Sequence, residues 1–216
     1  MSGRVGESSS SRRRTAAKSP RYDRSITVFS PEGRVFQVDY ARNSVKLEGI
    51  TSVAVRGADS VCVITQRTKA PADPLLDTAD PAFMHLFQIT ERLGMLATGM
   101  PVATVVGIDE EKGTPELFTC DPAGQVLGHK ATSVGLKEQE AIEFLEEAMA
   151  GNSSLSFQET MEMAVSALRH VLENNNQGHD IEVGVVRKNY PAFRTVWRRI
   201  YKSPVAGQNI LDGEGQ

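Results

Sequence analysis

The sequence predicts an α+β layered fold, and three observations lead to that prediction. The chain has 216 residues, of which 40% are hydrophobic, enough for one domain with a substantial core. Short alternating or apolar runs typical of strands fill the first half of the chain and return near its end. Two amphipathic helical patterns lie between those groups of strands. Strands, then helices, then strands is an order expected of α+β folds, and no internal repeat is visible.

The first residues carry almost nothing that a core could bury. Residues 1–21 are mainly Ser, Arg and Gly, a composition typical of a mobile tail. The basic run Arg12-Arg13-Arg14, with Lys18, is also compatible with a nuclear-import patch. Short basic runs are common, so we interpret this one as part of a solvated tail.

A helix is predicted to begin at Ser30-Pro31-Glu32. Ser30 can cap free N–H groups, Pro31 suits the first helical position, and Glu32 complements the positive end of the helix dipole. Apolar residues continue at helical spacing, so the helix is expected to end near Glu48-Gly49.

The strand predictions rest on alternation, apolar runs and intervening turn residues. In chain order they are Thr51–Arg56, Ser60–Thr65, Leu86–Thr90, Gly94–Thr98, Val102–Ile108, Leu117–Cys120, Gln125–His129, Ile181–Val186 and Phe193–Val196. The first two are expected to form a hairpin, and so are the two that flank Asp121–Gly124. Residues 70–81 hold several Pro and Asp and are expected to be loop.

Two helices are predicted between these strands. In the first, Ala141, Phe144, Leu145 and Ala148 share one face. The second opens on a capping box formed by Ser156 and Glu159. Its apolar stripe consists of Met161, Ala164, Val165, Leu168 and Leu172.

Composition excludes several classes of protein. With 24 basic and 27 acidic residues the net charge is -3, which provides no basic field for nucleic acid. Cys62 and Cys120 lack C-x-x-C spacing, so a disulfide framework is not expected and a reducing compartment is favoured. No apolar run approaches the roughly 20 residues of a membrane span, and the N-terminus lacks the apolar region of a secretory signal.

The sequence shows no familiar catalytic, metal or cofactor motif. There is no G-x-S-x-G, no H-E-x-x-H and no Gly-rich phosphate loop. The histidines His85, His129, His170 and His179 lack ligand spacing and are interpreted as ordinary surface or core residues. The acidic run Asp109–Glu111 is interpreted as a solvated turn. We therefore expect no catalytic residue, no metal and no cofactor.

The segment Tyr22–Ala41, YDRSITVFSPEGRVFQVDYA, resembles the N-terminal signature of proteasome α-type subunits. We call it the opening segment. Downstream motifs resemble the same family in the same order: GITSVAVRG at 49–57, VGIDEE at 106–111, CDPAG at 120–124, KAT at 130–132 and IEVGVV at 181–186. The resemblance covers about Arg21 to Thr195 and implies a domain at 22–197.

The resemblance implies a four-layer αββα sandwich of the N-terminal-nucleophile hydrolase type. In this family seven α subunits form a ring, and two such rings cap two catalytic β rings. The α subunits carry no protease activity, and their N-terminal segments close or open the axial channel. The implied partners are other α subunits, β subunits and the regulatory ATPase particle or other activators. The implied role is ubiquitin-dependent and ubiquitin-independent protein degradation in the cytoplasm and nucleus.

The resemblance also assigns site residues. Tyr22, Asp23, Pro31 and Tyr40 match the cluster that orders the N-terminal tails when the gate opens. Phenol hydroxyls can bond an aspartate and proline fixes a turn, which suits that role. Tyr40 taken alone could equally pack its helix on the strands. The helix from about Pro31 to Val45 is expected to contact neighbouring α subunits.

A second implied site is the pocket in which a lysine receives the C-terminal carboxylate of an activator. The family's lysine position falls in Gln66-Arg67-Thr68-Lys69. Arg67 occupies the matching place and Lys69 is the alternative. Either cation could pair with a carboxylate, with different geometry.

This chain departs from the family pattern at two places. The family has a long segment with two amphipathic helices between Gly99-Met100 and Val102, where this chain has only Met100-Pro101. One helical layer of the sandwich is therefore expected to be absent, with exposed sheet surface and low stability as the consequence. After Trp197 the family usually has an acidic helix, whereas residues 198–216 here are expected to form a divergent, structureless tail.

Two other functions compete with a non-catalytic scaffold and gating subunit. A threonine-dependent hydrolase of the same fold would need self-cleavage to expose an N-terminal threonine. Here Gly49 precedes Ile50, and Thr51 is not at a Gly-Thr junction, so this function is disfavoured. Nucleic-acid binding through the basic tail predicts salt-sensitive binding that is lost when residues 1–20 are deleted.

Overall fold

A computed structural model describes residues 21–44, 46, 49–67, 84–98, 102–151, 154–172 and 179–200. The chain divides into two compact units, residues 1–37 and residues 38–216, and each is described by itself. Several predictions lie outside the described residues. These are the tail before Arg21, the end of the first helix beyond Ser44, the loop 70–81, Lys69, the junction at Gly99–Pro101 and the tail after Ile200.

The prediction that a helix begins at Ser30 is wrong. The Ser30 carbonyl accepts the Gly33 N–H at 2.9 Å, and the Ser30 N–H donates to the Arg34 carbonyl at 2.8 Å. Gly33 adopts a positive φ of 78°, which a right-handed helix does not contain. Ser, Pro and Gly occupy the first, second and fourth positions of a β-turn, where each is favoured. The helix α1 begins later and spans Phe36–Ser44.

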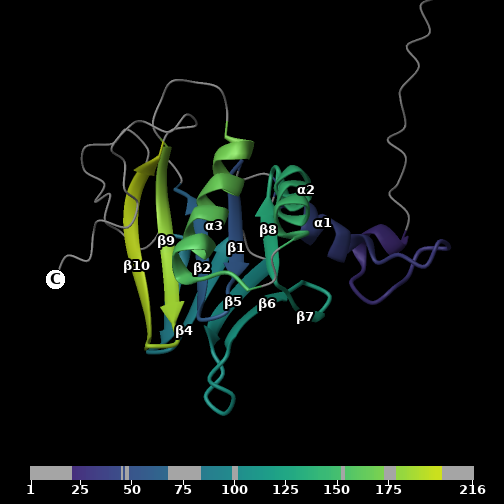
Figure 1. Ribbon diagram of the computed structural model, residues 1–216. Helices are drawn as coiled ribbons and strands as arrows, with labels where there is room; N and C mark the ends of the chain where they lie inside the picture. The colour runs from purple at the N-terminus through teal and green to yellow at the C-terminus, as the bar shows by residue number, and fades with distance from the viewer. Residues whose placement is uncertain are drawn as a thin grey trace, which may run out of the picture. The chain divides into compact units, whose positions relative to one another are not determined.

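The strands of the second unit form two antiparallel sheets (Figure 1). The helix-covered sheet has the order β10-β9-β2-β1-β8 and the outer sheet the order β3-β4-β5-β6-β7. The bounds are β1 Thr51–Arg56, β2 Ser60–Gln66, β3 Leu86–Thr90, β4 Leu93–Thr98, β5 Val102–Ile108, β6 Pro115–Cys120, β7 Val126–Gly128, β8 Ala131–Gly135, β9 His179–Arg187 and β10 Tyr190–Ile200. Both predicted hairpins are confirmed, since β1 pairs with β2 and β6 with β7.

Most predicted strands have observed ends within two residues of the predicted ones, and two strands differ by more. The strand β8 was not predicted, because its sequence Ala-Thr-Ser-Val-Gly carries small and hydroxyl side chains instead of an apolar run. It pairs with β1 from Thr51↔Gly135 to Val55↔Ala131. The strand β10 continues to Ile200, past the expected domain end at residue 197, and its last residues pair with β9.

Two helices cover one face of the helix-covered sheet. These are α2 (Glu138–Met149), which contacts β8, and α3 (Phe157–Val171), which contacts β1 and β2. Figure 1 shows both helices over that sheet. The predicted capping box is confirmed: the Glu159 N–H donates to Ser156 Oγ, and the Glu159 carboxylate accepts the Ser156 N–H. The N–H and the hydroxyl of Ser156 both donate to the Glu159 carboxylate, and these two bonds hold its pKa below the usual value.

The buried faces of the helices mostly match the prediction. The whole predicted stripe of α3 is buried: Met161, Ala164, Val165, Leu168 and Leu172. In α2, Ala141 and Leu145 are buried, whereas the predicted Ala148 is exposed. Met149, which has a longer side chain, packs against the core near that end of the helix instead.

The core consists of two hydrophobic clusters that define three layers. One cluster lies between the helices and the helix-covered sheet and includes Val53, Ile64 and Leu168. The other lies between the two sheets and includes Val63, Leu96 and Leu117. In the described part of the chain the layer order is therefore helices, sheet, sheet, and no described helix covers the far face of the outer sheet.

Candidate functional site

The opening segment presents apolar side chains to solvent. Arg21–Arg24 form a short 3-10 helix, η1, and an irregular stretch leads from it to the turn at Ser30. In that stretch Ile26 is 75% exposed and Phe29 is 66% exposed. Large apolar residues on a short polar segment are typical of a surface that another chain covers.

The structure places the predicted gate residues as follows. Tyr22 lies in η1, and its side chain is outside the described part. Asp23 is half-buried, and its carbonyl accepts the side-chain amide of Gln37. Pro31 is exposed in the turn. Tyr40, on α1, is 49% exposed. Tyr40 belongs to the second unit and the others to the first, so the grouping of these residues stays a prediction.

Of the predicted activator-pocket residues, Arg67 is described and Lys69 is not. Arg67 directly follows β2, is half-buried, and its N–H donates to the Asp180 carbonyl at 2.9 Å. This bond fixes the backbone of Arg67 beside the start of β9. The anchored backbone suits a residue that must present a cation in a defined direction.

Thr51, the nucleophile required by the competing hydrolase function, lies inside the structure. It is 2% exposed, its N–H donates to Gln66 Oε1 at 2.7 Å, and its hydroxyl accepts the Lys137 N–H at 3.2 Å. The preceding residue, Ile50, is buried and accepts the Leu136 N–H through its carbonyl. An N-terminal nucleophile needs a free amine and a free hydroxyl, and the uncut chain provides neither at Thr51.

A buried carboxylate that sequence reasoning missed joins the two sheets. Glu182, on β9, is 1% exposed, and its Oε2 accepts the N–H groups of His85 at 3.0 Å and Leu86 at 3.2 Å. Its Oε1 has no hydrogen-bond partner within the described ranges. The available signal was one charged residue at an inward position of the apolar strand Ile181–Val186.

Glu182 continues into a row of buried hydroxyl groups. Its cross-strand neighbour is Thr65, which pairs in turn with Ser52. The oxygens of Ser52 and Thr65 lie 2.6 Å apart, and Ser52 Oγ lies 3.3 Å from Thr98 Oγ1 of the outer sheet. These hydroxyl groups bond one another, so the row connects the sheets and leaves no free nucleophile.

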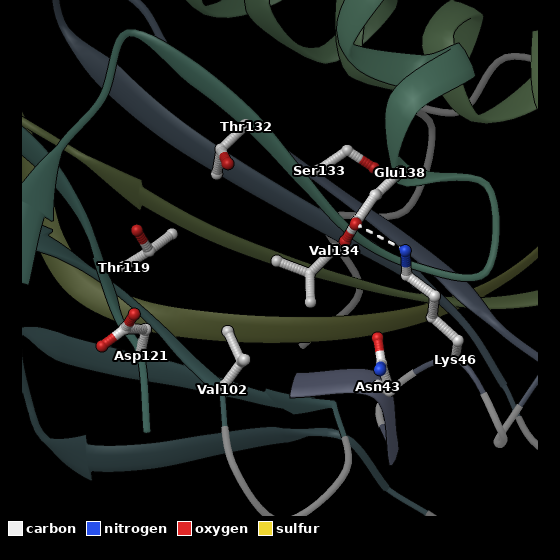
Figure 2. Close-up of a pocket in the computed structure, with 9 residues that line it drawn as sticks. All are labelled: Asn43, Lys46, Val102, Thr119, Asp121, Thr132, Ser133, Val134 and Glu138. Carbon is white, nitrogen blue, oxygen red and sulfur yellow. Dashed lines mark ion pairs between the residues drawn. The ribbon is translucent and has the colours of Figure 1, made fainter. Parts of the chain in front are cut away.

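A cavity of about 380 Å³ lies beside the edge strand β8, and residues in or next to β5, β6, α1 and α2 line the rest of it (Figure 2). Its lining consists of Asn43, Lys46, Val102, Thr119, Asp121, Thr132, Ser133, Val134 and Glu138. Lys46 and Glu138 form an ion pair at 3.1 Å, marked in Figure 2, with side chains 47% and 36% exposed. An exposed pair of this kind contributes little to stability.

The polar contacts around the cavity are structural. Thr119 Oγ1 lies 2.8 Å from His129 Nε2 and ties β6 to the residue after β7, while burial lowers the pKa of His129. Ser133 Oγ donates to the Ser52 carbonyl at 2.8 Å. Within the described ranges, no group of three His, Cys, Asp or Glu residues could hold a metal ion. None of the described helices is long and apolar enough to span a membrane.

Comparisons with known proteins identify the family. The model of the N-terminal signature of A-type proteasome subunits matches residues 22–43, and the general model of proteasome subunits matches residues 102–186. The probable alpha type-1 proteasome subunit of Schizosaccharomyces pombe is 33% identical, over 81% of this chain and 91% of the relative. The chain belongs to the proteasome α-subunit family. The alpha type-6 proteasome subunit of Caenorhabditis elegans is 30% identical over 80% of this chain and 89% of its own length.

Proteasome α subunits are the non-catalytic components of the outer ring, so the match argues against the hydrolase function. They assemble with other subunits into the proteasome core. The match to the S. pombe protein runs over 228 positions but covers only 81% of the 216 residues here. The relative therefore carries residues inside the matched span that this chain lacks.

Proposed function

We propose that this chain is a structural and gating subunit of the outer ring, in which the opening segment contacts neighbouring α subunits and arranges chain ends at the axial channel. In this role it supports ubiquitin-dependent and ubiquitin-independent protein degradation in the cytoplasm and nucleus. The observation that carries the proposal is the opening segment itself: a matched α signature at residues 22–43 whose apolar side chains face solvent. Residues with these exposures gain free energy when a neighbouring subunit covers them.

Ring contact through the opening segment is testable with charge substitutions. We expect the double variant Ile26→Asp, Phe29→Asp to enter core particles at least about tenfold less than the unchanged chain, because assembly would bury both new charges. The measurement is the fraction of tagged chain that co-migrates with the other α subunits. Thr27→Asp is the matched control, since Thr27 is exposed in the same stretch and already polar. An unchanged chain that never migrates with the core particle would contradict the proposal.

Asp23 is proposed to help order the chain ends when the channel opens. In assembled particles, Asp23→Ala is expected to lower activator-stimulated peptide hydrolysis on the order of fivefold while basal hydrolysis stays unchanged, because only the open arrangement loses contacts. Glu140→Ala, which removes an exposed carboxylate on α2, should have no effect. Equal stimulation in the Asp23 variant and this control would rule out a gating role for Asp23.

Arg67 is proposed to receive the C-terminal carboxylate of an activator. Arg67→Ala is expected to weaken binding of an activator's C-terminal peptide to assembled particles about tenfold, because it removes a charge-assisted hydrogen bond. Arg67→Lys should retain part of the affinity, since it keeps the charge but loses the planar fork. If Lys69→Ala weakens binding and Arg67→Ala does not, the carboxylate belongs to Lys69.

A further inference from the structure

The space between the two sheets holds a carboxylate oxygen that no described group satisfies. Glu182 is 1% exposed; its Oε2 accepts two backbone N–H groups, whereas its Oε1 accepts none in the described ranges. Among the described residues, no Lys, Arg or His side chain forms an ion pair with this carboxylate. A buried charge is costly unless it is paired or bound to a metal ion, so Oε1 calls for a ligand.

Three buried hydroxyl groups share the space with this carboxylate. Glu182 lies opposite Thr65 across β9 and β2, and Thr65 lies opposite Ser52 across β2 and β1, so the three side chains are neighbours on one face. Thr98 approaches from the outer sheet, with its Oγ1 3.3 Å from Ser52 Oγ. The carboxylate also bonds the N–H of His85, whose carbonyl accepts the N–H of the residue before Thr98. We call Glu182, Thr65, Ser52 and Thr98 the buried oxygen cluster.

The hydroxyl hydrogens of the buried oxygen cluster are already engaged. The Thr65 hydroxyl donates to the Gln66 carbonyl at 3.2 Å. The 2.6 Å contact between Ser52 and Thr65 therefore uses the Ser52 hydrogen, and the 3.3 Å contact between Thr98 and Ser52 uses the Thr98 hydrogen. A hydroxyl has one hydrogen and two lone pairs. The cluster thus has only lone pairs left to offer, and a group of acceptors around a buried charge favours a positively charged ligand.

We propose that the buried oxygen cluster binds one monovalent alkali cation, Na⁺ or K⁺, between the two sheets. One such ion neutralises the single negative charge of Glu182, and hydroxyl oxygens are suitable further ligands for a hard cation. A divalent ion would need more carboxylates than the one that the cluster contains. A water molecule could donate to Oε1, but it would leave the buried charge without a counter-charge. This site lies within one chain and does not depend on the proposed function.

The test is urea unfolding of the purified full chain, followed by circular dichroism, in NaCl, KCl or N-methyl-D-glucamine chloride. The three salts are used at equal ionic strength, about 100 mM, so that the screening of surface charges is the same. A ligand that binds only the folded chain lowers the unfolding equilibrium constant by the factor 1 + [L]/Kd. For a Kd of about 10 mM, this constant should be about tenfold lower in the preferred alkali salt than in the glucamine salt.

Glu182→Gln is the decisive variant. It keeps an oxygen that can accept the two backbone N–H groups, but it removes the charge and adds an amide N–H₂ group, which cannot ligate a cation. Its unfolding should therefore be the same in the three salts. Thr98→Val removes one hydroxyl ligand at similar volume and should weaken cation binding about threefold or more. Glu140→Gln, which removes an exposed carboxylate on α2, is the control and should keep the full dependence on the cation.

Broadening of the sodium-ion NMR resonance provides a readout that does not depend on stability. The folded chain should broaden this resonance more than Glu182→Gln does, and added KCl should reverse the difference by competition for the site. Equal unfolding of the unchanged chain in the three salts overturns the inference and would assign Oε1 to a water molecule or a proton. An equal dependence on the cation in the chain and in Glu182→Gln also overturns it, because the cation would then bind elsewhere.

Discussion

Purified at low concentration, the chain is expected to melt over a broad temperature range and to bind a hydrophobic dye such as anilinonaphthalene sulfonate. Phe87, Met95, Val105 and Phe118 form a continuous row that no described helix covers. Each large apolar side chain left without cover forgoes roughly 1.5–3 kcal/mol of burial. Net stabilities of domains are about 5–15 kcal/mol, so a missing layer removes a large share of the stability.

The measurements are a thermal melt followed by circular dichroism and the dye fluorescence of the purified chain at low concentration. Phe118→Lys should reduce dye fluorescence per chain, because it places a charge in the middle of the apolar row. A sharp cooperative melt with background dye fluorescence at low concentration would show that the outer sheet needs no cover.

Glu182→Ala is expected to leave the purified chain unfolded at 25 °C. The substitution removes the acceptor of two backbone N–H groups, those of the half-buried His85 and the buried Leu86, which now donate to the Glu182 carboxylate. Leaving buried donors without partners, together with the cavity, costs about 2–5 kcal/mol. The outward face of the outer sheet has no described helix over it, so the free energy of unfolding is expected to be small. The cost of the substitution is therefore expected to exceed that free energy.

Glu182→Gln is the matched control. Its amide oxygen can accept the same two N–H groups, and its amide nitrogen replaces Oε1, which has no partner within the described ranges. The Gln variant should therefore keep the circular dichroism of the folded chain, with a lower urea midpoint. An Ala variant with the dichroism and urea midpoint of the unchanged chain would show that this carboxylate does not hold the sheets together.

The fold could be predicted from the sequence where turn and capping residues indicated the same element as the pattern of apolar side chains. Val102–Ile108 is predicted and observed with the same bounds, because a short apolar run rich in Val between turn residues favours a strand over a helix. The capping box is also confirmed, because Ser156 and Glu159 have the required spacing just before the apolar stripe of α3. The Ser-Pro-Glu-Gly sequence at residues 30–33 has two interpretations, a helix start and a β-turn, and the positive φ of Gly33 decides between them.

The candidate site is harder to predict than the fold, because the exposure and the bonding partners of its residues depend on segments that are distant in the sequence. The opening segment identifies the family by itself, yet its value as a contact surface depends on the exposure of Ile26 and Phe29, which no sequence pattern gives. The role of Glu182 in joining the sheets could not be predicted from the sequence. Its partners, His85 and Leu86, lie almost a hundred positions away, at the other sheet. Such long-range pairing is set by the stacking of the sheets and leaves no periodic signal in the chain.

The hydrogen bonds around Thr51 have a consequence for protein engineering. Directed evolution of a peptidase on this scaffold would have to cut the backbone before β1, release the Gln66 amide and the Lys137 N–H, and then build a proton acceptor. No single substitution accomplishes all of these changes, and the intermediates would lose stability without gaining turnover. Peptidase chemistry is thus separated from this polypeptide by a fitness valley that random mutation will not readily cross.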